Sequence, residues 1–148
     1  MSTAETVSRD TTLMVRDTCL CLHTQRAARA LARRFDEAFR PLDLTNGQFS
    51  LLMSLNRPEP PTLGSVAALL AMDRTTLTAA LKPLERRKLV KVHIDQEDRR
   101  SRRLVLTESG RTLLAKAVPI WQAEHAALDK DLAGFSLDRL RANLNAIT

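Results

Sequence analysis

Apolar residues recur at every third or fourth position through most of this chain, which is the spacing of amphipathic helices. The spacing predicts a long first helix over residues 13–40, which Pro41 ends because proline disfavours helical geometry in the residue before it. It also predicts a long helix that Thr107 caps and that reaches about residue 132, and a final helix that Ser136 caps. The expected fold is therefore mainly helical.

Three shorter helices are predicted between the two long ones. Residues 45–48 have the spacing of a capping box at the start of the first. Thr62 can cap a helix over residues 63–70, and Asp73 can cap a helix over residues 74–87. Two helices joined by so short a link are typical of a helix-turn-helix, whose second helix enters the major groove of DNA.

The helical spacing gives way to a different pattern after the second of these helices. Two short β-favouring runs, residues 89–94 and 104–106, flank a charged and turn-prone segment over residues 95–103. This pattern predicts a β-hairpin with arginines at its tip. The fold class we expect is mainly α with a small β-hairpin wing, that is, a winged helix-turn-helix of about six helices.

The chain of 148 residues has a formal net charge of +6, and the position of that charge along the sequence is informative. The segment 74–111 contains eleven Lys and Arg against five Asp and Glu, whereas the rest of the chain contains twelve of each sign. A basic face that only keeps a protein in solution would spread this excess. Its concentration on the predicted helix and hairpin indicates a polyanionic partner, and we expect double-stranded DNA.

The residues expected to contact DNA lie on that helix and in the hairpin. Threonine hydroxyls at a helix N-terminus can hydrogen-bond to base edges, and a narrow minor groove favours arginine because its cation is cheaper to desolvate than that of lysine. We expect Arg100, nearest the turn, to enter the groove. Asp98 has the wrong charge for DNA and is expected to pair with Arg100 or Arg102, which would fix the shape of the wing. The candidates are Arg74, Thr75, Thr76, Thr78, Lys82, Asp98, Arg99, Arg100 and Arg102.

Four stretches of the chain form a set of motifs, namely LTNGQFSLL at 44–52, MDRTTLT at 72–78, DRRSRR at 98–103 and LTESG at 106–110. Together they resemble the MarR family of winged helix-turn-helix regulators, and the resemblance covers nearly all of residues 13–148. It implies an obligate homodimer in which each wing enters the minor groove beside a palindromic operator. It further implies transcriptional repression that a small aromatic or phenolic effector relieves.

The resemblance also assigns the parts of the chain. Residues 1–12 are polar and are expected to form a flexible N-terminal tail, followed by a single domain over residues 13–148. Within that domain, residues 13–42 and 107–148 would supply the dimerisation helices. Residues 45–106 would form the winged helix-turn-helix lobe that binds DNA.

One position departs from the family's pattern. The family commonly has glycine just before the first strand of the wing, where this chain has Lys88. A lysine held in left-handed backbone geometry would cost about 1 kcal/mol.

An effector site is implied by analogy with the family alone, between the first helix and the helices on either side of the DNA-binding lobe. The wall residues that this analogy suggests are His23, Arg26, Phe49, Met53 and Trp121. If the effector were an aromatic acid or its thioester, Arg26 or Arg29 could hold the carboxylate.

Cys21 falls where the organic-hydroperoxide-sensing branch of the family has its reactive cysteine. That branch holds its cysteine with tyrosines, and this chain contains no tyrosine. A small buried hydrophobic residue is therefore the favoured interpretation of Cys21, and a cysteine-based, oxidant-sensing repressor is the alternative. Cys19 and Cys21 are two residues apart on the predicted first helix and roughly 200° apart around its axis, so they are not expected to pair with each other.

Other classes of protein are less consistent with the sequence. An enzyme is not expected, because the three histidines are scattered and no glycine-rich phosphate loop is present. No metal or other cofactor is expected, since Cys19 and His23 do not complete a site. A non-specific architectural protein that binds DNA phosphates alone is a further alternative. The N-terminus lacks the apolar core of a signal peptide, which predicts a cytoplasmic protein with no membrane partner.

Overall fold

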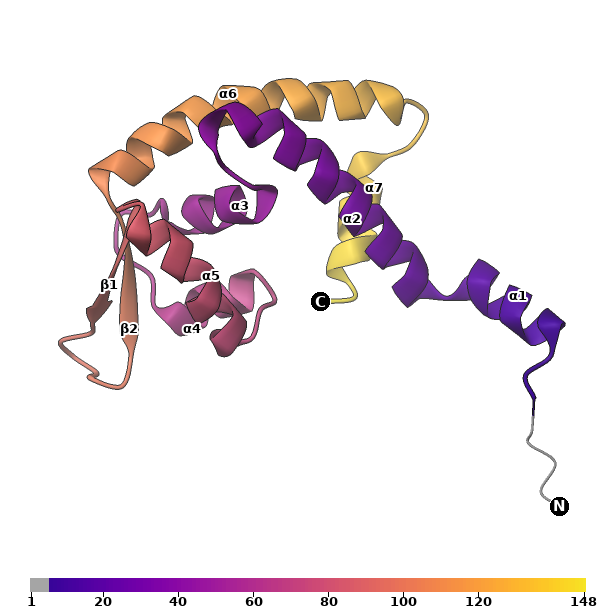
Figure 1. Ribbon diagram of the computed structural model, residues 1–148, viewed down its shortest axis with the longest axis horizontal. Coiled ribbons are helices and arrows are strands. Elements are labelled where there is room, and N and C mark those ends of the chain that lie inside the picture. The colour runs from indigo at the N-terminus through magenta and orange to yellow at the C-terminus, as the bar shows by residue number, and fades with distance from the viewer. Residues whose placement is uncertain (1–5) are drawn as a thin grey trace, which may run out of the picture. The chain divides into compact units, whose positions relative to one another are not determined.

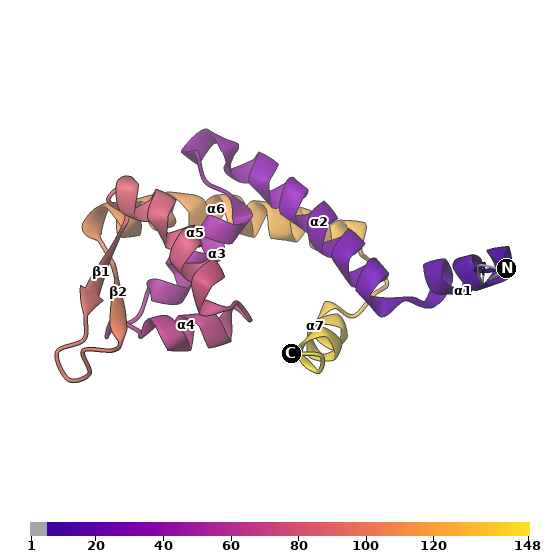
Figure 2. The same ribbon diagram turned by 60° about the horizontal axis from the view of Figure 1, so that its bottom comes forward.

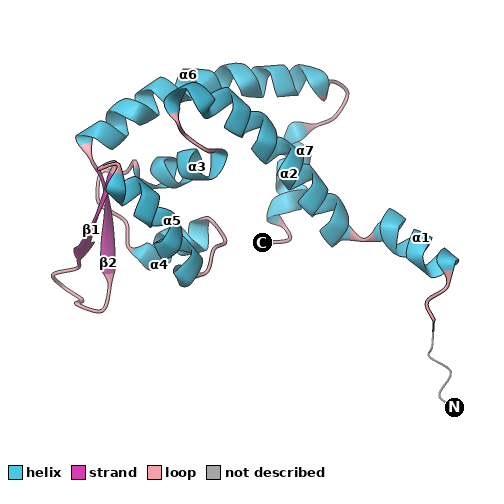
Figure 3. Cartoon of the chain, in the orientation of Figure 1, coloured by secondary structure: helices cyan, strands magenta, loops and turns pink. Residues whose placement is uncertain are grey.

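The computed structural model describes residues 6–148, and the chain divides into two compact units, Met1–Arg34 and Phe35–Thr148. Helices account for most of the described residues, and one antiparallel hairpin is the β-structure among them (Figures 1 and 3). The elements are α1 Arg9–Thr18, α2 Leu20–Phe39, the 3-10 turn η1 Arg40–Leu42, α3 Asn46–Leu55, α4 Leu63–Leu69, α5 Arg74–Arg86, β1 Val90–Ile94, β2 Arg102–Leu106, α6 Glu108–Asp131 and α7 Leu137–Asn145. The predicted fold class is confirmed, with seven α-helices over residues 6–148 in place of about six.

The additional helix arises because the predicted first helix is two helices. It begins at Arg9 rather than Leu13, since the hydroxyl of Ser8 accepts a hydrogen bond from the backbone N–H of Thr11 and caps α1. It is interrupted at Cys19, whose backbone is extended with φ −69° and ψ 110°. The expected flexible tail over residues 1–12 is therefore helical from Arg9 onward, and residues 1–5 lie outside the described part of the chain.

The helix starts predicted from side-chain caps are confirmed. At α3 both halves of the capping box form, with Gln48 N–H donating to Thr45 Oγ1 and Gln48 Oε1 accepting from Thr45 N–H. The other four caps accept a hydrogen bond from the backbone N–H three residues later; they are Thr62, Asp73, Thr107 and Ser136. Pro41 lies in η1, directly after α2 ends at Phe39.

The core of the unit 35–148 explains which face of α5 is exposed. Leu77, Leu81 and Leu84 are spaced by four and three residues and are almost fully buried. They pack in one cluster with residues from α3 and with Leu104 and Leu106 of β2. Burial of this leucine stripe leaves the threonine-bearing side of α5 at the surface.

The hairpin is joined to the connector between α3 and α4. Strands β1 and β2 pair in a register that sets Val90 opposite Leu106 and Ile94 opposite Arg102. The backbone N–H of Leu104 donates to the Pro61 carbonyl at 3.0 Å, and Thr62 forms an isolated bridge with Arg103. The hairpin thus extends outward from a base that is fixed to the lobe of α3, α4 and α5 (Figure 2).

Lys88 adopts the left-handed conformation expected of it, with φ 58°. The turn that ends α5 is nevertheless complete, because Leu89 N–H donates to the Leu84 carbonyl at 3.0 Å. The lysine therefore occupies a position that favours glycine, at a cost in backbone strain.

Replacing Lys88 by glycine should stabilise the protein by about 1 kcal/mol, because glycine adopts this φ without steric cost. Urea denaturation measures the change in the free energy of unfolding. The control is Arg86→Gly in the last turn of α5, where the backbone is helical and glycine should destabilise by about 1 kcal/mol. Equal destabilisation by the two variants would refute the strain at Lys88.

No helix among residues 6–148 combines the length and the apolar character that a membrane crossing requires.

Candidate nucleic-acid interface

The first turn of α5 is fixed by its cap. Asp73 Oδ1 accepts a hydrogen bond from the backbone N–H of Thr76 at 2.7 Å, and this bond is the main reason that the pKa of Asp73 lies below its ordinary value. The Thr78 hydroxyl donates to the Arg74 carbonyl at 2.8 Å, so its proton is already used within the helix. The five candidates on this helix are all exposed; they are Arg74, Thr75, Thr76, Thr78 and Lys82. Their exposure fits the role assigned to them from the sequence.

The tip of the wing is held by hydrogen bonds to its backbone. Asp98 Oδ1 accepts from the backbone N–H of Arg100 at 3.0 Å, and Asp95 Oδ1 accepts from that of Glu97 at 3.1 Å. The Ser101 N–H donates to the Asp98 carbonyl at 2.9 Å. The expected pairing of Asp98 with the guanidinium of Arg100 or Arg102 is wrong: within the described residues Asp98 fixes the tip through the main chain.

The wing arginines differ in what they contact. Arg99, Arg100 and Arg102 are exposed, and Arg102 Nη1 donates to the carbonyls of Arg99 and Ser101 at 3.2 and 3.3 Å. Arg74 of α5 and the wing tip line one small cavity of about 210 Å³. The structure therefore brings the helix candidate Arg74 together with the wing candidates.

Arg103 has a role that the sequence analysis did not assign to it. Its Nε lies 3.2 Å from Asp95 Oδ2, and its Nη1 donates to the Pro60 carbonyl at 2.9 Å. The Asp95 side chain is only 12% exposed, so this ion pair is better shielded from solvent than an ordinary surface pair. Arg103 thus ties β2 to the other side of the hairpin and to the α3–α4 connector, which sets the position of the wing. The signal available in the sequence is the alternation of side chains along a strand, which puts Arg103 on the opposite face from Arg102.

Replacing Arg103 by glutamine should weaken DNA binding roughly fivefold, the equivalent of about one net hydrogen bond. The dependence of affinity on salt should not change, because no phosphate contact is lost. Replacing Arg99 by glutamine should instead reduce the slope of log K against log salt by about 0.9 for each phosphate contact. Titrations of labelled duplex over a range of salt concentrations compare the two. An equal loss of slope in both variants would make Arg103 a phosphate contact and refute its positioning role.

The five candidates for the effector site fall into two groups that belong to different units. Phe49 stacks on Trp121 with ring centroids 6.4 Å apart, and Trp121 lies 4.9 Å from the His125 ring. Met53, on the same helix as Phe49, is 41% exposed. These aromatic residues of the unit 35–148 form one cluster, which continues from Phe49 to Phe39.

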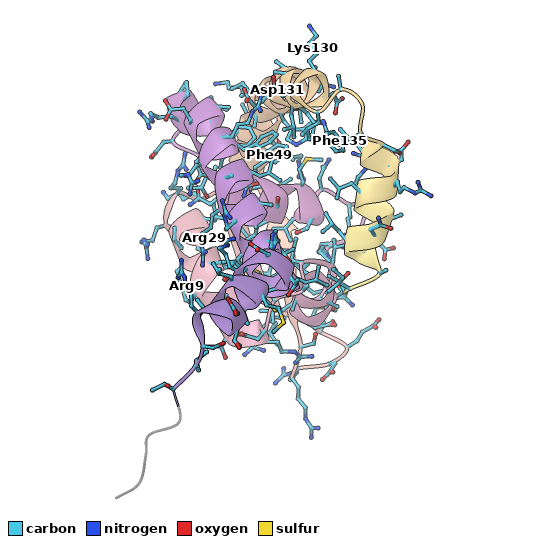
Figure 4. All side chains as sticks on the ribbon, turned by 90° about the vertical axis from the view of Figure 1, so that its right-hand side faces the viewer. Arg9, Arg29, Phe49, Lys130, Asp131 and Phe135 are labelled. Carbon is cyan, nitrogen blue, oxygen red and sulfur yellow. The ribbon has the colours of Figure 1, made fainter. Side chains whose placement is uncertain are left out.

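His23 and Arg26 lie on an exposed face of α2 that is otherwise formed by alanine and arginine. They line one shallow hollow with Ala27, Arg29, Ala30 and Arg33 (Figure 4 labels Arg29). His23 Nδ1 is 2.8 Å from the Cys19 carbonyl. This face of α2 is therefore basic and accessible to an anionic ligand.

Cys21 is exposed in the single chain, so nothing within one protomer buries it, and its role stays a prediction. The α2 residues on either side of it are largely exposed as well, because the core cluster of this protein begins at Phe35. Cys19 is half-buried and lies at the break between α1 and α2, so the argument from a continuous helix does not apply to the two thiols. Both are free thiols. Among residues 6–148 no group of three or more His, Cys, Asp or Glu is placed to hold a metal ion.

Comparison with known proteins agrees with a winged helix-turn-helix arrangement of α3 to β2. The sequence pattern of the MarR family matches residues 44–101, which span α3 to the wing tip. The organic hydroperoxide resistance transcriptional regulator of Bacillus subtilis is 32% identical over 101 residues, which are 68% of this chain and 69% of that protein. A transcriptional regulator of Methylorubrum extorquens, TtmR, is 32% identical over 100 residues, which are 68% of this chain and 51% of TtmR.

Solved structures extend the likeness over most of the chain. The Mycobacterium tuberculosis transcriptional regulator MosR in complex with DNA is 37% identical, with a TM-score of 0.79 over 87% of this chain and 92% of MosR. The transcriptional repressor CouR bound to a 23-mer DNA duplex is 28% identical, with a TM-score of 0.78 over 97% of this chain and 99% of CouR. These relatives are regulators of transcription rather than enzymes. The chain belongs to the MarR family of winged-helix, DNA-binding transcriptional regulators.

Proposed function

We propose that this protein is a sequence-specific repressor that binds a palindromic operator as a homodimer and is released by a small aromatic or phenolic effector. The observation that supports this most is the convergence of two kinds of DNA-reading side chain in one unit. Exposed threonines open α5, and a rigid, arginine-bearing wing tip lies beside Arg74 of the same helix. A protein that held phosphates alone would not need the threonines. The structures of MosR and CouR, which are similar to this chain, are complexes with DNA.

The exposed apolar residues support a homodimer. Large apolar side chains of α7 and of the residues on either side of it are exposed, including Phe135 at 74% before the helix and Ile147 at 66% after it (Figure 4 labels Phe135). Leu20 at the start of α2 is 73% exposed. Apolar surface of this extent on terminal helices is typical of an interface between protomers. We therefore assign residues 13–42 and 107–148 to dimerisation and residues 45–106 to DNA binding.

The two groups of candidate residues suggest the chemistry of the effector. Trp121 is 38% exposed and packs between His125 and the buried Phe49, so its indole offers a flat apolar surface to an aromatic ring. Arg26 and its neighbours on α2 offer guanidinium groups to a carboxylate. The first group fits an aromatic effector, and the second fits an anionic one.

A second candidate function is oxidant sensing through Cys21. Its thiol is exposed, and the chain is similar to an organic hydroperoxide resistance regulator. Organic hydroperoxide would then release wild-type protein from DNA but not a Cys21→Ser variant, whereas an aromatic effector would release both. Equal release of both proteins by peroxide would rule out Cys21 as the sensor.

The experiment that tests the proposed function is a footprint on the DNA upstream of the protein's own gene, with and without excess random competitor. Two protected half-sites about one helical turn apart, which persist with competitor, would support a dimeric, site-specific regulator. Diffuse protection that competitor removes would refute this function at that site and favour the architectural alternative.

A further inference from the structure

The cavity between α5 and the wing tip is unusual in its lining. It has a volume of about 210 Å³, several times the share of roughly 30 Å³ that one water occupies in the liquid. Three arginines from two elements border it, Arg74 from α5 and Arg100 and Arg102 from the wing, against the single carboxylate of Asp98. The remaining lining is Thr62, Leu63, Gly64 and Ser101. The cavity therefore has an excess of two positive charges, hydroxyl groups and little apolar surface.

Gly64 leaves the space that the Arg74 side chain occupies at this cavity. A Cβ atom built on Gly64 would lie 2.9 Å from Arg74 Nη2 and 3.6 Å from its Cζ, so the guanidinium packs directly on the glycine. It therefore lies back over the first turn of α4, on the side where the wing tip is, instead of extending forward from the end of α5. Glycine at position 64 is what makes this approach possible.

Arg102 borders the cavity from the wing. Its Nη1 is bound to the carbonyls of Arg99 and Ser101, and the turn that carries it is closed by Asp98. One Asp98 oxygen is already engaged by the backbone N–H of Arg100, which reduces its repulsion of an incoming anion. The guanidinium groups of Arg74 on α5 and Arg102 on β2 are thus positioned before an anion binds. Little side-chain entropy is therefore lost when an anion enters.

We propose that this cavity binds one phosphate of the DNA backbone, clamped between Arg74 and Arg102. The inference rests on the proposed DNA-binding function and specifies it. The proposal makes Arg74 a phosphate contact rather than a base contact. The clamp joins the helix in the major groove to the wing in the minor groove through a single backbone group, and so fixes the register of the protein on the duplex without reading sequence.

The first test is Arg74→Gln, assayed by titration of a short random-sequence duplex and of the footprinted operator at several salt concentrations. Affinity should fall roughly tenfold or more at low salt, as for loss of a hydrogen bond to a charged group. The slope of log K against log salt should decrease by about 0.9 per protomer, and the loss should be the same on both duplexes. The control is Lys116→Gln, which removes one exposed cation of α6 outside the cavity and should leave the slope unchanged.

The second test moves the Arg74 side chain without removing its charge. Gly64→Ala puts a methyl group where the guanidinium lies, and the flexible end of the arginine can move away. Alanine favours helix, so the fold should be at least as stable, while the salt slope should decrease as in Arg74→Gln. The matched control is Gly47→Ala in α3, where an added Cβ meets no atom within 4 Å and DNA binding should not change.

Two results would overturn the clamp. An unchanged salt slope in Arg74→Gln, while wild-type protein binds DNA, would mean that no phosphate enters the cavity. A loss confined to one base pair of the operator and absent on random duplex would make Arg74 a base contact. Failure of the proposed function is distinguishable from both, because wild-type protein would then bind the operator and random duplex equally. The salt slope of Arg74→Gln on random duplex would still show whether Arg74 contacts a phosphate.

Discussion

Replacing Gly110 by alanine should destabilise the unit 35–148 by about 3 kcal/mol. Gly110 is buried in the first turn of α6, against the base of the wing. A Cβ atom there would lie 2.3 Å from the Leu89 carbonyl oxygen and 2.7 Å from Leu106 Cδ1. The first of these atoms belongs to the backbone and cannot turn away, so either α6 or the strand must move.

Moving α6 or the strand would disturb hydrogen bonds as well as side-chain packing. The Leu89 carbonyl accepts hydrogen bonds from the Thr107 N–H at 3.1 Å and from its hydroxyl at 3.0 Å, and Thr107 is also the cap of α6. Displacing Leu89 would therefore weaken the cap and the base of the hairpin together. The motif LTESG ends in glycine because a helix start and a strand end approach closely here.

Urea denaturation of Gly110→Ala beside Gly47→Ala measures the effect of this contact. The two variants make the same chemical change in the first turn of a helix, but an added methyl at Gly47 meets no atom within 4 Å. Only Gly110→Ala should shift the midpoint to lower urea. A midpoint shift of the same size in both variants would show that the close approach of Leu89 does not require glycine at position 110.

The parts of the fold that local rules determine were predictable from the sequence. A cap and the amide it binds are three residues apart, so Thr45, Asp73 and Thr107 could be recognised without knowing the fold. The burial of Leu77 and Leu81 followed from spacing in the same way. The left-handed geometry of Lys88, in contrast, was expected only from the glycine that the family commonly has at this position.

The contacts that determine the candidate site were less predictable, because they join residues distant in the sequence or use the backbone. Arg103 binds the carbonyl of Pro60, 43 residues earlier. Gly64 positions Arg74 by the absence of a side chain, which composition does not reveal. Asp98 binds a backbone N–H two residues away, although the adjacent guanidinium groups made an ion pair the simpler expectation. Charge patterns identified the surface, and packing decided the role of each residue on it.

Replacing Arg100 by alanine should weaken DNA binding by about 2 kcal/mol per protomer, which is roughly thirtyfold for each wing. Arg100 is exposed at the tip, and Asp98 holds its backbone N–H at 3.0 Å, so the side chain extends from a rigid turn. A side chain fixed in this way reaches a groove at little cost in conformational entropy. Arg100→Lys should recover only part of the loss, because a narrow minor groove disfavours the more strongly hydrated ammonium.

The measurement is a duplex titration combined with size-exclusion chromatography of each variant. Gln96→Ala is the control, because Gln96 is exposed in the same tip and uncharged, and its removal should leave affinity unchanged. Elution and thermal unfolding of Arg100→Ala should match the wild type, since Arg100 lies outside both the core and the apolar surface assigned to the dimer. If Arg100→Ala bound the operator as tightly as the wild type, the wing would not enter the groove. The excess of positive charge between Arg74 and Arg111 would then act through α5 and the phosphate backbone alone.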